Sequence, residues 1–288
     1  MYEQIPCRSI DHRNCEPLEG VPHVSYLMHS DDEGETWSAP RDVNGSVTLT
    51  GADTAGVGPG IAIQKDFAPH AGRIAFPFRG LGLNYAGVSD DGGETWTVGE
   101  PADDSQVDGG GNEVQFAELS DGTILLNARS TVDTGFRKVS RSADGGETWA
   151  PLEDDDELVD PQVMASILRF SDAITEDRER LLFTNPSHPE VRVNGTVRLS
   201  YDGGETWPVA RLVPAETFVF AYSVLGRLDC RNAALLFEEG VNTQRIVFAR
   251  FSIHWLTEGI DEPDCAGPPQ ESAAGDSRSR LTSGPSII

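Results

Sequence analysis

The chain has 288 residues, a length that suits one large all-β domain or two ordinary domains. Its 22 basic and 47 acidic residues give a net charge of −25, and a field of that sign repels nucleic acid and anionic membrane surfaces. No apolar run reaches the roughly eighteen residues of a membrane-spanning helix. We therefore expect no nucleic acid partner and no transmembrane segment, and an anionic small substrate would need a local arginine cluster.

The remaining composition gives little direction about metals, cofactors or cellular compartment. The first eight residues lack the charged-then-apolar pattern of a secretory signal, so localisation stays open. The four cysteines have no zinc-type spacing and are too few for a disulfide framework, so that Cys7 and Cys15 either pair or remain thiols. The six histidines form no metal-binding pattern. We expect no metal and no cofactor.

One eight-residue sequence motif, the repeated phrase, occurs four times along the chain. It has the form Ser-x-Asp-x-Gly-x-Thr-Trp and begins at Ser30, Ser89, Ser142 and Ser200. Ser and Asp side chains suit a tight turn because they bond to nearby backbone N–H groups, and the glycine two residues after the aspartate permits a positive φ. The four aspartates are therefore expected to be structural, not catalytic: Asp32, Asp91, Asp144 and Asp202.

Short apolar or β-branched runs surround these turns and predict strands. In chain order they are Val24–Met28, Gly72–Phe78, Thr123–Arg129, Leu181–Asn185, Thr196–Ser200, Ala233–Glu238 and Arg245–Ile253. The acidic run Glu153–Glu157 is interpreted as a loop, and no segment has the pattern of a long amphipathic helix. A period of about 55 residues with several short strands in each repeat indicates the blades of an all-β propeller.

The composition divides the chain into three parts. Residues 1–22 are predicted to be an irregular N-terminal segment, and residues 23–260 to be the propeller. Residues 261–288 are rich in Gly, Pro, Ser and Ala and are predicted to be a disordered tail.

The phrases and the segments between them resemble the sialidase (exo-α-neuraminidase) family with Asp-box, or BNR, repeats. The similarity includes Gly58–Gln64, Asn112–Gln115, Asn127–Ser130, Arg192–Ser200 and Leu236–Gly240, and it extends in the family's order from about Ser25 to Leu256. The resemblance implies a six-bladed β-propeller, of which about five blades are covered here. It implies removal of terminal sialic acid from glycoproteins, gangliosides or oligosaccharides, so that a sialylated glycan is the expected partner.

The resemblance also assigns roles to individual residues. Tyr222 matches the family's nucleophile and Glu113 its general base, while Arg129 and Arg192 match two of the three arginines that bind the substrate carboxylate. Glu238 matches the glutamate that positions the remaining arginine. These residue types suit the chemistry, because the arginine fork binds carboxylates in a bidentate way and a neutral tyrosine does not repel an anionic sugar.

Each assignment has an alternative within the sequence. Arg198 and Glu239 are the neighbouring candidates for the roles of Arg192 and Glu238. Tyr222 also fits a core aromatic, and Glu113 also fits a loop carboxylate. Arg192 is preferred because Arg198 lies in the middle of a predicted strand, and Glu238 is preferred because it directly follows an apolar run. The Ala-Tyr-Ser setting favours Tyr222 as the nucleophile, and a glutamate beside an apolar strand suits a buried base.

Two parts of the family pattern are not matched. The first arginine and the acid/base aspartate belong before the segment aligned with this chain, and Arg8 and Asp11 match them by residue type but not by surroundings. The alternative function is accordingly an inactive or truncated sialidase-like propeller that only binds sialylated glycans. An open ring of blades would leave an apolar blade face exposed, unless the chain closes as five blades.

Overall fold

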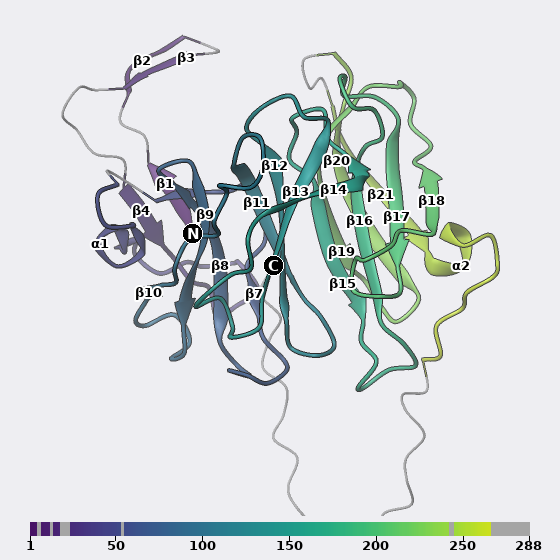
Figure 1. Ribbon diagram of the computed structural model, residues 1–288, viewed down its shortest axis with the longest axis horizontal. Coiled ribbons are helices and arrows are strands. Elements are labelled where there is room, and N and C mark those ends of the chain that lie inside the picture. The colour runs from purple at the N-terminus through teal and green to yellow at the C-terminus, as the bar shows by residue number, and fades with distance from the viewer. Residues whose placement is uncertain (5–6, 12–13, 18–23, 53–54, 242–244, 266–288) are drawn as a thin grey trace, which may run out of the picture.

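A computed structural model describes residues 1–4, 7–11, 14–17, 24–52, 55–241 and 245–265, with the backbone alone at 2–4, 7–11 and 14–17. The side chains of Cys7, Arg8, Asp11 and Cys15 lie outside this description, as does the predicted tail from residue 266 onward. The structure is all-β, with strands that pair antiparallel into successive sheets (Figure 1).

The sheets follow one another in chain order. The N-terminal sheet contains β1 (Tyr2–Gln4), β4 (Val24–Leu27) and β5 (Arg41–Asp42), and a separate hairpin contains β2 (Cys7–Asp11) and β3 (Asn14–Pro17). The next sheet contains β6 (Gly56–Val57), β7 (Ile63–Gln64), β8 (Ile74–Gly80), β9 (Leu83–Ser89) and β10 (Thr97–Val98). Residues 1–22, predicted to be irregular, thus contribute a strand that pairs with β4.

Three further sheets complete the series. The first contains β11 (Gly111–Glu118), β12 (Ile124–Ser130), β13 (Phe136–Ser142) and β14 (Glu153–Val159). The second contains β15 (Ser166–Ser171), β16 (Arg180–Pro186), β17 (Gly195–Ser200) and β18 (Val209–Leu212). The third contains β19 (Phe220–Arg227), β20 (Asn232–Glu239) and β21 (Arg245–Ser252).

The four sheets from β6 to β21 are arranged as propeller blades, which confirms the predicted fold class. The sequence predicted about five blades, and the smaller N-terminal sheet lies beside these four (Figure 1). The described residues include two helices, α1 (Asn44–Val47) and α2 (Ile253–Leu256), of four residues each. No helix in the described part of the chain is long and apolar enough to cross a membrane.

Apolar side chains hold each sheet to the next. Phe116 and Leu126 pack with Ala86 across one boundary, and Phe183 packs with Leu125 across the following one. Each fully buried Leu or Phe contributes about 1.5–3 kcal/mol by leaving water. The strands buried on both faces are therefore the continuous apolar runs that the sequence displayed, such as β12 and β16.

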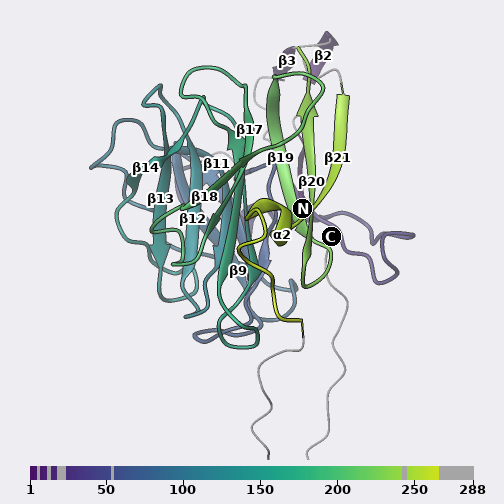
Figure 2. The same cartoon turned by 90° about the vertical axis from the view of Figure 1, so that its right-hand side faces the viewer.

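The last sheet has one covered face and one exposed face. Leu235 and Phe237 are buried against the preceding blade, whereas Leu236, Ile246 and Phe248 are 42%, 62% and 64% exposed. Figure 2 shows this sheet, β19 to β21, at one edge of the molecule. The structure therefore has the exposed apolar blade face that the sequence predicts for an open ring.

The four Ser-x-Asp-x-Gly-x-Thr-Trp phrases are turns between strands, as predicted, and each joins the last two strands of its sheet. In the turn after β9, Asp91 accepts bonds from the Thr95 amide (2.9 Å) and hydroxyl (2.6 Å), and Gly93 donates its N–H to Ser89 at 2.8 Å. Gly93 has a φ of 92°. The indole of Trp96 donates to the Gly93 carbonyl at 3.0 Å, so the phrase closes on itself.

The acidic run Glu153–Glu157 is a strand, and the loop prediction was wrong. It forms the outer edge of its sheet, where β14 pairs with β13 so that Arg137 is opposite Asp155 and Lys138 is opposite Asp154. Most of its side chains are exposed to solvent. The acidic residues are tolerated in this strand because they face water or basic cross-strand partners.

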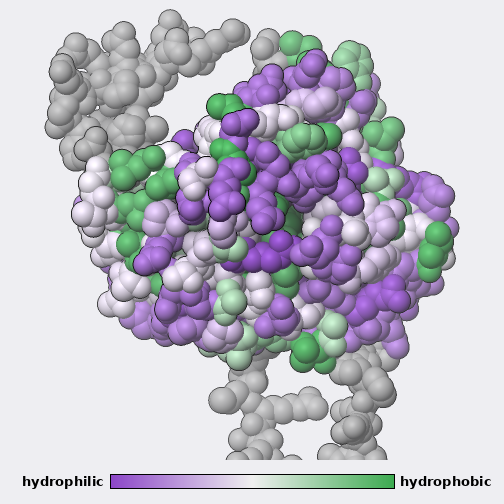
Figure 3. Space-filling view, viewed as in Figure 1, coloured by the Kyte–Doolittle hydropathy of each residue, from purple (hydrophilic) through white to green (hydrophobic). Residues whose placement is uncertain are grey.

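Hydrophilic residues cover much of the face of the molecule in Figure 3, with hydrophobic residues in smaller patches. This agrees with the 24% of charged residues in the sequence.

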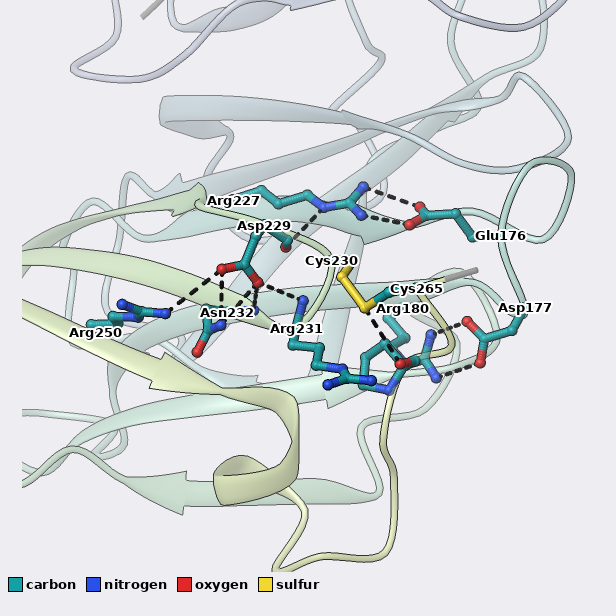
Figure 4. Close-up of a disulfide and its surroundings, with 11 residues drawn as sticks. Glu176, Asp177, Arg180, Arg227, Asp229, Cys230, Arg231, Asn232, Arg250 and Cys265 are labelled. Atoms are coloured by element: carbon teal, nitrogen blue, oxygen red, sulfur yellow. Dashed lines mark hydrogen bonds and ion pairs between the residues drawn. A yellow bond between two sulfur atoms is a disulfide. The ribbon is translucent and has the colours of Figure 1, made fainter. Parts of the chain in front are cut away.

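The described chain continues beyond the predicted start of the tail at Asp261. Asp261 is buried and forms an ion pair with Arg180 at 2.7 Å, and it accepts a bond from the Tyr201 hydroxyl at 2.8 Å. A disulfide between Cys230 and Cys265 joins the same segment to the turn after β19 (Figure 4). The sequence did not predict this disulfide, since 35 residues separate its cysteines.

Candidate active site

Three strands from two different blades supply the centre of the site. Glu113 lies in β11, Arg129 in the neighbouring β12, and Tyr222 in β19. Glu113 and Tyr222 both fall within register shifts, one between Gly111 and Val114 and the other between Phe220 and Ser223. Such irregularities redirect a side chain out of the regular alternation of a strand. The strand backbone therefore aims both side chains at one point.

The side chains of Tyr222, Glu113 and Arg129 are in mutual contact. The Tyr222 hydroxyl donates to Glu113 Oε1 at 2.5 Å, and Arg129 Nη1 donates to Glu113 Oε2 at 2.8 Å. Arg129 Nη1 also lies 3.3 Å from the Tyr222 oxygen. The Glu113 and Arg129 side chains are 13% and 22% exposed. One carboxylate thus accepts from both partners in a site that is shielded but open to solvent.

The surroundings keep the tyrosine neutral. Burial and the hydrogen bond to the Glu113 carboxylate raise the pKa of Tyr222 to about 12. Arg129 and Arg192 oppose this effect because their charge favours tyrosinate. Burial acts to lower the pKa of Arg129, but the bond to Glu113 and the charges of Glu113, Tyr222 and Asp160 together outweigh burial, and the net shift is upward. The phenol therefore needs an adjacent base to become nucleophilic at neutral pH.

Arg192 lies against the ring of the same tyrosine. Its guanidinium carbon is 5.5 Å from the Tyr222 ring centroid, and its Nη2 donates to the Gln162 carbonyl at 2.7 Å. The Arg192 carbonyl accepts the Phe220 amide at 3.0 Å, which ties this loop to the start of β19. Arg198, the neighbouring candidate, instead donates to Ser187 from the middle of β17. Arg192 is thus the member of the pair that meets Tyr222.

The two glutamates at the end of β20 have different surroundings. Glu238 is partly exposed and accepts a long bond, 3.4 Å, from the Tyr222 amide. Glu239 is buried, accepts from the Thr217 amide at 2.8 Å and pairs with Arg245 at 2.9 Å. Glu238 therefore contacts the Tyr222 backbone, and Glu239 holds neighbouring segments of its own sheet together.

The four aspartates of the repeated phrase lie in their turns, bonded to residues of their own phrase. They do not join the Tyr222 cluster. Among the described residues, no group of three or more His, Cys, Asp and Glu side chains could hold a metal ion.

Sequence reasoning missed the residues that support the arginines. Gln162 contributes only its carbonyl, and Asp160 and Arg137 are buried behind it. A contact made by a backbone carbonyl does not depend on residue type, so the sequence does not indicate it. Asp160 followed by Pro161 has the pattern of an ordinary turn.

Comparisons with known proteins show which family the chain belongs to. Residues 16–229 match the family model for the BNR repeat-like domain, and 248 residues are 37% identical to a sialidase of Micromonospora viridifaciens. The chain belongs to the sialidase family with BNR repeats. A second member of the sialidase family, an exo-alpha-sialidase of Aspergillus fumigatus, is 29% identical over 256 residues.

Solved structures of the sialidase family include an intramolecular trans-sialidase from Ruminococcus gnavus in complex with oseltamivir carboxylate. It superposes with a TM-score of 0.69 at 26% identity, over 82% of this chain and 51% of that one. The two sequence relatives align with 82% and 84% of this chain but with 36% and 58% of their own lengths. The chain therefore spans about a third to just over a half of the sialidases that it matches.

Proposed function

We propose that this chain is an exo-α-sialidase that removes terminal sialic acid from glycans with retention of configuration, using Tyr222 as the nucleophile. The observation that carries the proposal is the 2.5 Å hydrogen bond from the Tyr222 hydroxyl to Glu113, beside Arg129 and Arg192. Family membership supports the glycosidase class, and this cluster supports the particular mechanism.

In the first step the arginines bind the sugar carboxylate, and the Tyr222 oxygen attacks the anomeric carbon. Glu113 Oε1 takes the phenol proton as the carbon–oxygen bond forms. A phenol with a pKa of about 12 is neutral before attack, so it does not repel the anionic sugar. The aglycone leaves with the electrons of the glycosidic bond and requires a proton if it is an alcohol.

In the second step water attacks the same carbon and displaces the tyrosine, which regains its proton from Glu113, while the proton that the water releases passes to solvent. The two displacements together retain the anomeric configuration. Aryl sialosides have leaving groups that depart without protonation, so their hydrolysis tests the Tyr222 nucleophile without depending on a general acid.

The test is hydrolysis of an aryl sialoside by the purified chain, compared with Tyr222→Phe. That variant keeps the aromatic ring over which Arg192 lies and removes only the hydroxyl. We expect kcat to fall at least about 10³-fold in Tyr222→Phe. A 3-fluoro sialosyl fluoride forms a covalent intermediate from which the sugar is released slowly. Detection of this intermediate on Tyr222 by peptide mass spectrometry would support the tyrosine mechanism directly.

Turnover by Tyr222→Phe at the wild-type rate would rule out the nucleophile assignment. A folded wild-type chain that binds sialosides without turnover would instead favour the alternative of a glycan-binding propeller. Circular dichroism and a cooperative melting transition establish folding in either case.

A further inference from the structure

A fully buried ion pair lies beside the two arginines of the proposed site. Arg137 and Asp160 are both 0% exposed, and Arg137 Nη1 is 3.3 Å from Asp160 Oδ1. Arg137 also donates to Asn127 Oδ1 at 2.8 Å and to the Val163 carbonyl at 2.7 Å. The pair therefore connects β12 and β13 to the segment that follows β14.

Asp160 reaches Arg129 through the backbone. Its Oδ2 accepts the amide of Ser130, the residue after Arg129, at 2.8 Å. Ser130 is the last residue of β12 and is itself buried. This bond fixes the end of the strand, and hence the Cα of Arg129, in a place where the ladder of the sheet ends.

The same carboxylate shapes the loop that holds Arg192. Asp160 Oδ1 accepts the Val163 amide at 3.1 Å, while Arg137 binds the Val163 carbonyl. Between these fixed points Gln162 adopts a positive φ of 53° and presents its carbonyl to Arg192 Nη2. A non-glycine residue persists in this conformation when its surroundings determine it.

We infer that Asp160 and Arg137 are positioning residues that set the spacing of the two carboxylate-binding arginines. Asp160 acts on Arg129 through the Ser130 amide and on Arg192 through the Gln162 carbonyl, and Arg137 holds the loop on its far side. This inference rests on the proposed function, because the spacing matters only if both arginines bind one carboxylate.

Energetics favour a positioning role over a purely stabilising one. Removal of two charges from water costs several kcal/mol per ion, and apolar replacements of buried pairs are often neutral or stabilising. The Asp160 carboxylate nevertheless satisfies two amides and one guanidinium at once, which a well-packed apolar side chain cannot do. The pair thus orders two backbone segments that end at the site.

The test compares Arg137→Met/Asp160→Asn with the wild type. The double variant removes both charges together, so neither is left buried without its partner. Calorimetry measures binding of a non-hydrolysable thiosialoside and of the methyl ester of the same compound. We expect the wild type to prefer the acid, and the double variant to lose about tenfold of that preference, equivalent to one charge-assisted hydrogen bond. Binding of the ester is expected to change little.

Arg180→Met/Asp261→Asn is the matched control. It removes another buried Arg–Asp pair, 0% and 7% exposed, whose described bonds go to Asp177, Ser171 and Tyr201. It is expected to lower Tm and to leave the preference for acid over ester unchanged. An equal loss of preference in this control would overturn the inference.

A wild type that prefers the acid, with a double variant that keeps the full preference, would overturn the inference alone. A wild type that binds acid and ester equally would contradict the proposed function, and the inference with it. If the double variant does not fold, Arg137→Lys replaces it, because lysine keeps the charge but not the fork that binds Asn127 and Val163 together. An unchanged preference in folded Arg137→Lys would likewise overturn the inference.

Discussion

Opposing influences act on the hydroxyl of Tyr222. Burial and the Glu113 carboxylate favour the neutral phenol, whereas Arg129 and Arg192 favour tyrosinate. Burial and the Glu113 carboxylate outweigh the two arginines and raise the pKa of Tyr222 to about 12. Glu113 thus has two roles. Its carboxylate accepts the 2.5 Å hydrogen bond from the Tyr222 hydroxyl, and before substrate binds its negative charge disfavours loss of the phenol proton.

Replacement of Glu113 by Gln is expected to lower the pKa of Tyr222 from about 12 toward the ordinary value of 10.0. The variant removes the anion and leaves the two guanidinium groups, which favour tyrosinate. Titration of protein labelled at the tyrosine ζ-carbon, followed by NMR, measures this pKa, and Tyr222→Phe assigns the signal among the five tyrosines.

Tyr201 is the control signal, since burial and Asp261 raise its pKa to about 12 without any contribution from Glu113. A Tyr222 pKa that stays near 12 in Glu113→Gln would mean that burial alone sets it. The raised pKa of Tyr222 also makes the stability of the fold depend on pH. Because the folded pKa is above the unfolded one, Tyr222 stabilises the fold below pH 10, and this contribution is lost as the pH rises from about 10 toward 12.

The C-terminal segment after β21 is an element held by two kinds of bond. The ion pair of Asp261 with Arg180 attaches it to β16, and the disulfide of Cys265 with Cys230 attaches it to the turn between β19 and β20. These two attachments connect the last two blades along an edge where the strands themselves do not pair.

Substitution of both cysteines, Cys230→Ala/Cys265→Ala, is expected to lower the free energy of unfolding by about 3–4 kcal/mol. The estimate comes from the chain entropy of a loop with a sequence separation of 35 residues. Calorimetry of the two proteins measures the difference, and a reducing agent should lower the Tm of the wild type but not of the variant. Equal Tm values in both would show that Asp261 and its partners suffice to hold the segment.

Local elements were predictable from sequence, and long-range contacts were less so. The turns of the repeated phrase were predictable because the side-chain bonds of Asp91 and Ser89 reach at most four residues along the chain. β14 was missed because its acidic side chains carry no alternating pattern, and its cross-strand partners in β13 determine its structure. The Cys230–Cys265 disulfide depends on how blades are placed relative to one another, and no local pattern encodes that placement.

The candidate site also contains residues that were predictable from sequence and residues that were not. Tyr222, Glu113, Arg129 and Arg192 were selected because each lies in a motif that resembles the family, and the structure brings all four together. Asp160 and Gln162 act through backbone groups, so their residue types alone did not distinguish them from turn residues.

The whole molecule carries a net charge of −25, and like charges at its surface repel one another in the folded state. The buried ion pairs, such as Lys65 with Glu118 at 2.7 Å, are shielded from dissolved ions and are affected much less by salt.

A rise in NaCl from about 10 mM to about 1 M is expected to raise Tm, because the Debye length shrinks from roughly 30 Å to 3 Å and the surface repulsion is screened. Differential scanning calorimetry over this range measures the effect. Sucrose, which adds no ions, serves as the control for general solute exclusion. A Tm that falls steadily with NaCl would mean that attractive surface pairs outweigh the net repulsion.

The repeated turns also have a consequence for the order in which the molecule acquires its structure. The bonds within each turn link residues at most four apart, and each blade packs on blades adjacent in the chain, so hairpins and then blades can form with little loop closure. The Tyr222–Glu113 bond, in contrast, joins residues 109 positions apart. The reactive cluster is therefore expected to form last on refolding and to be lost first in mild denaturant, while most strands persist.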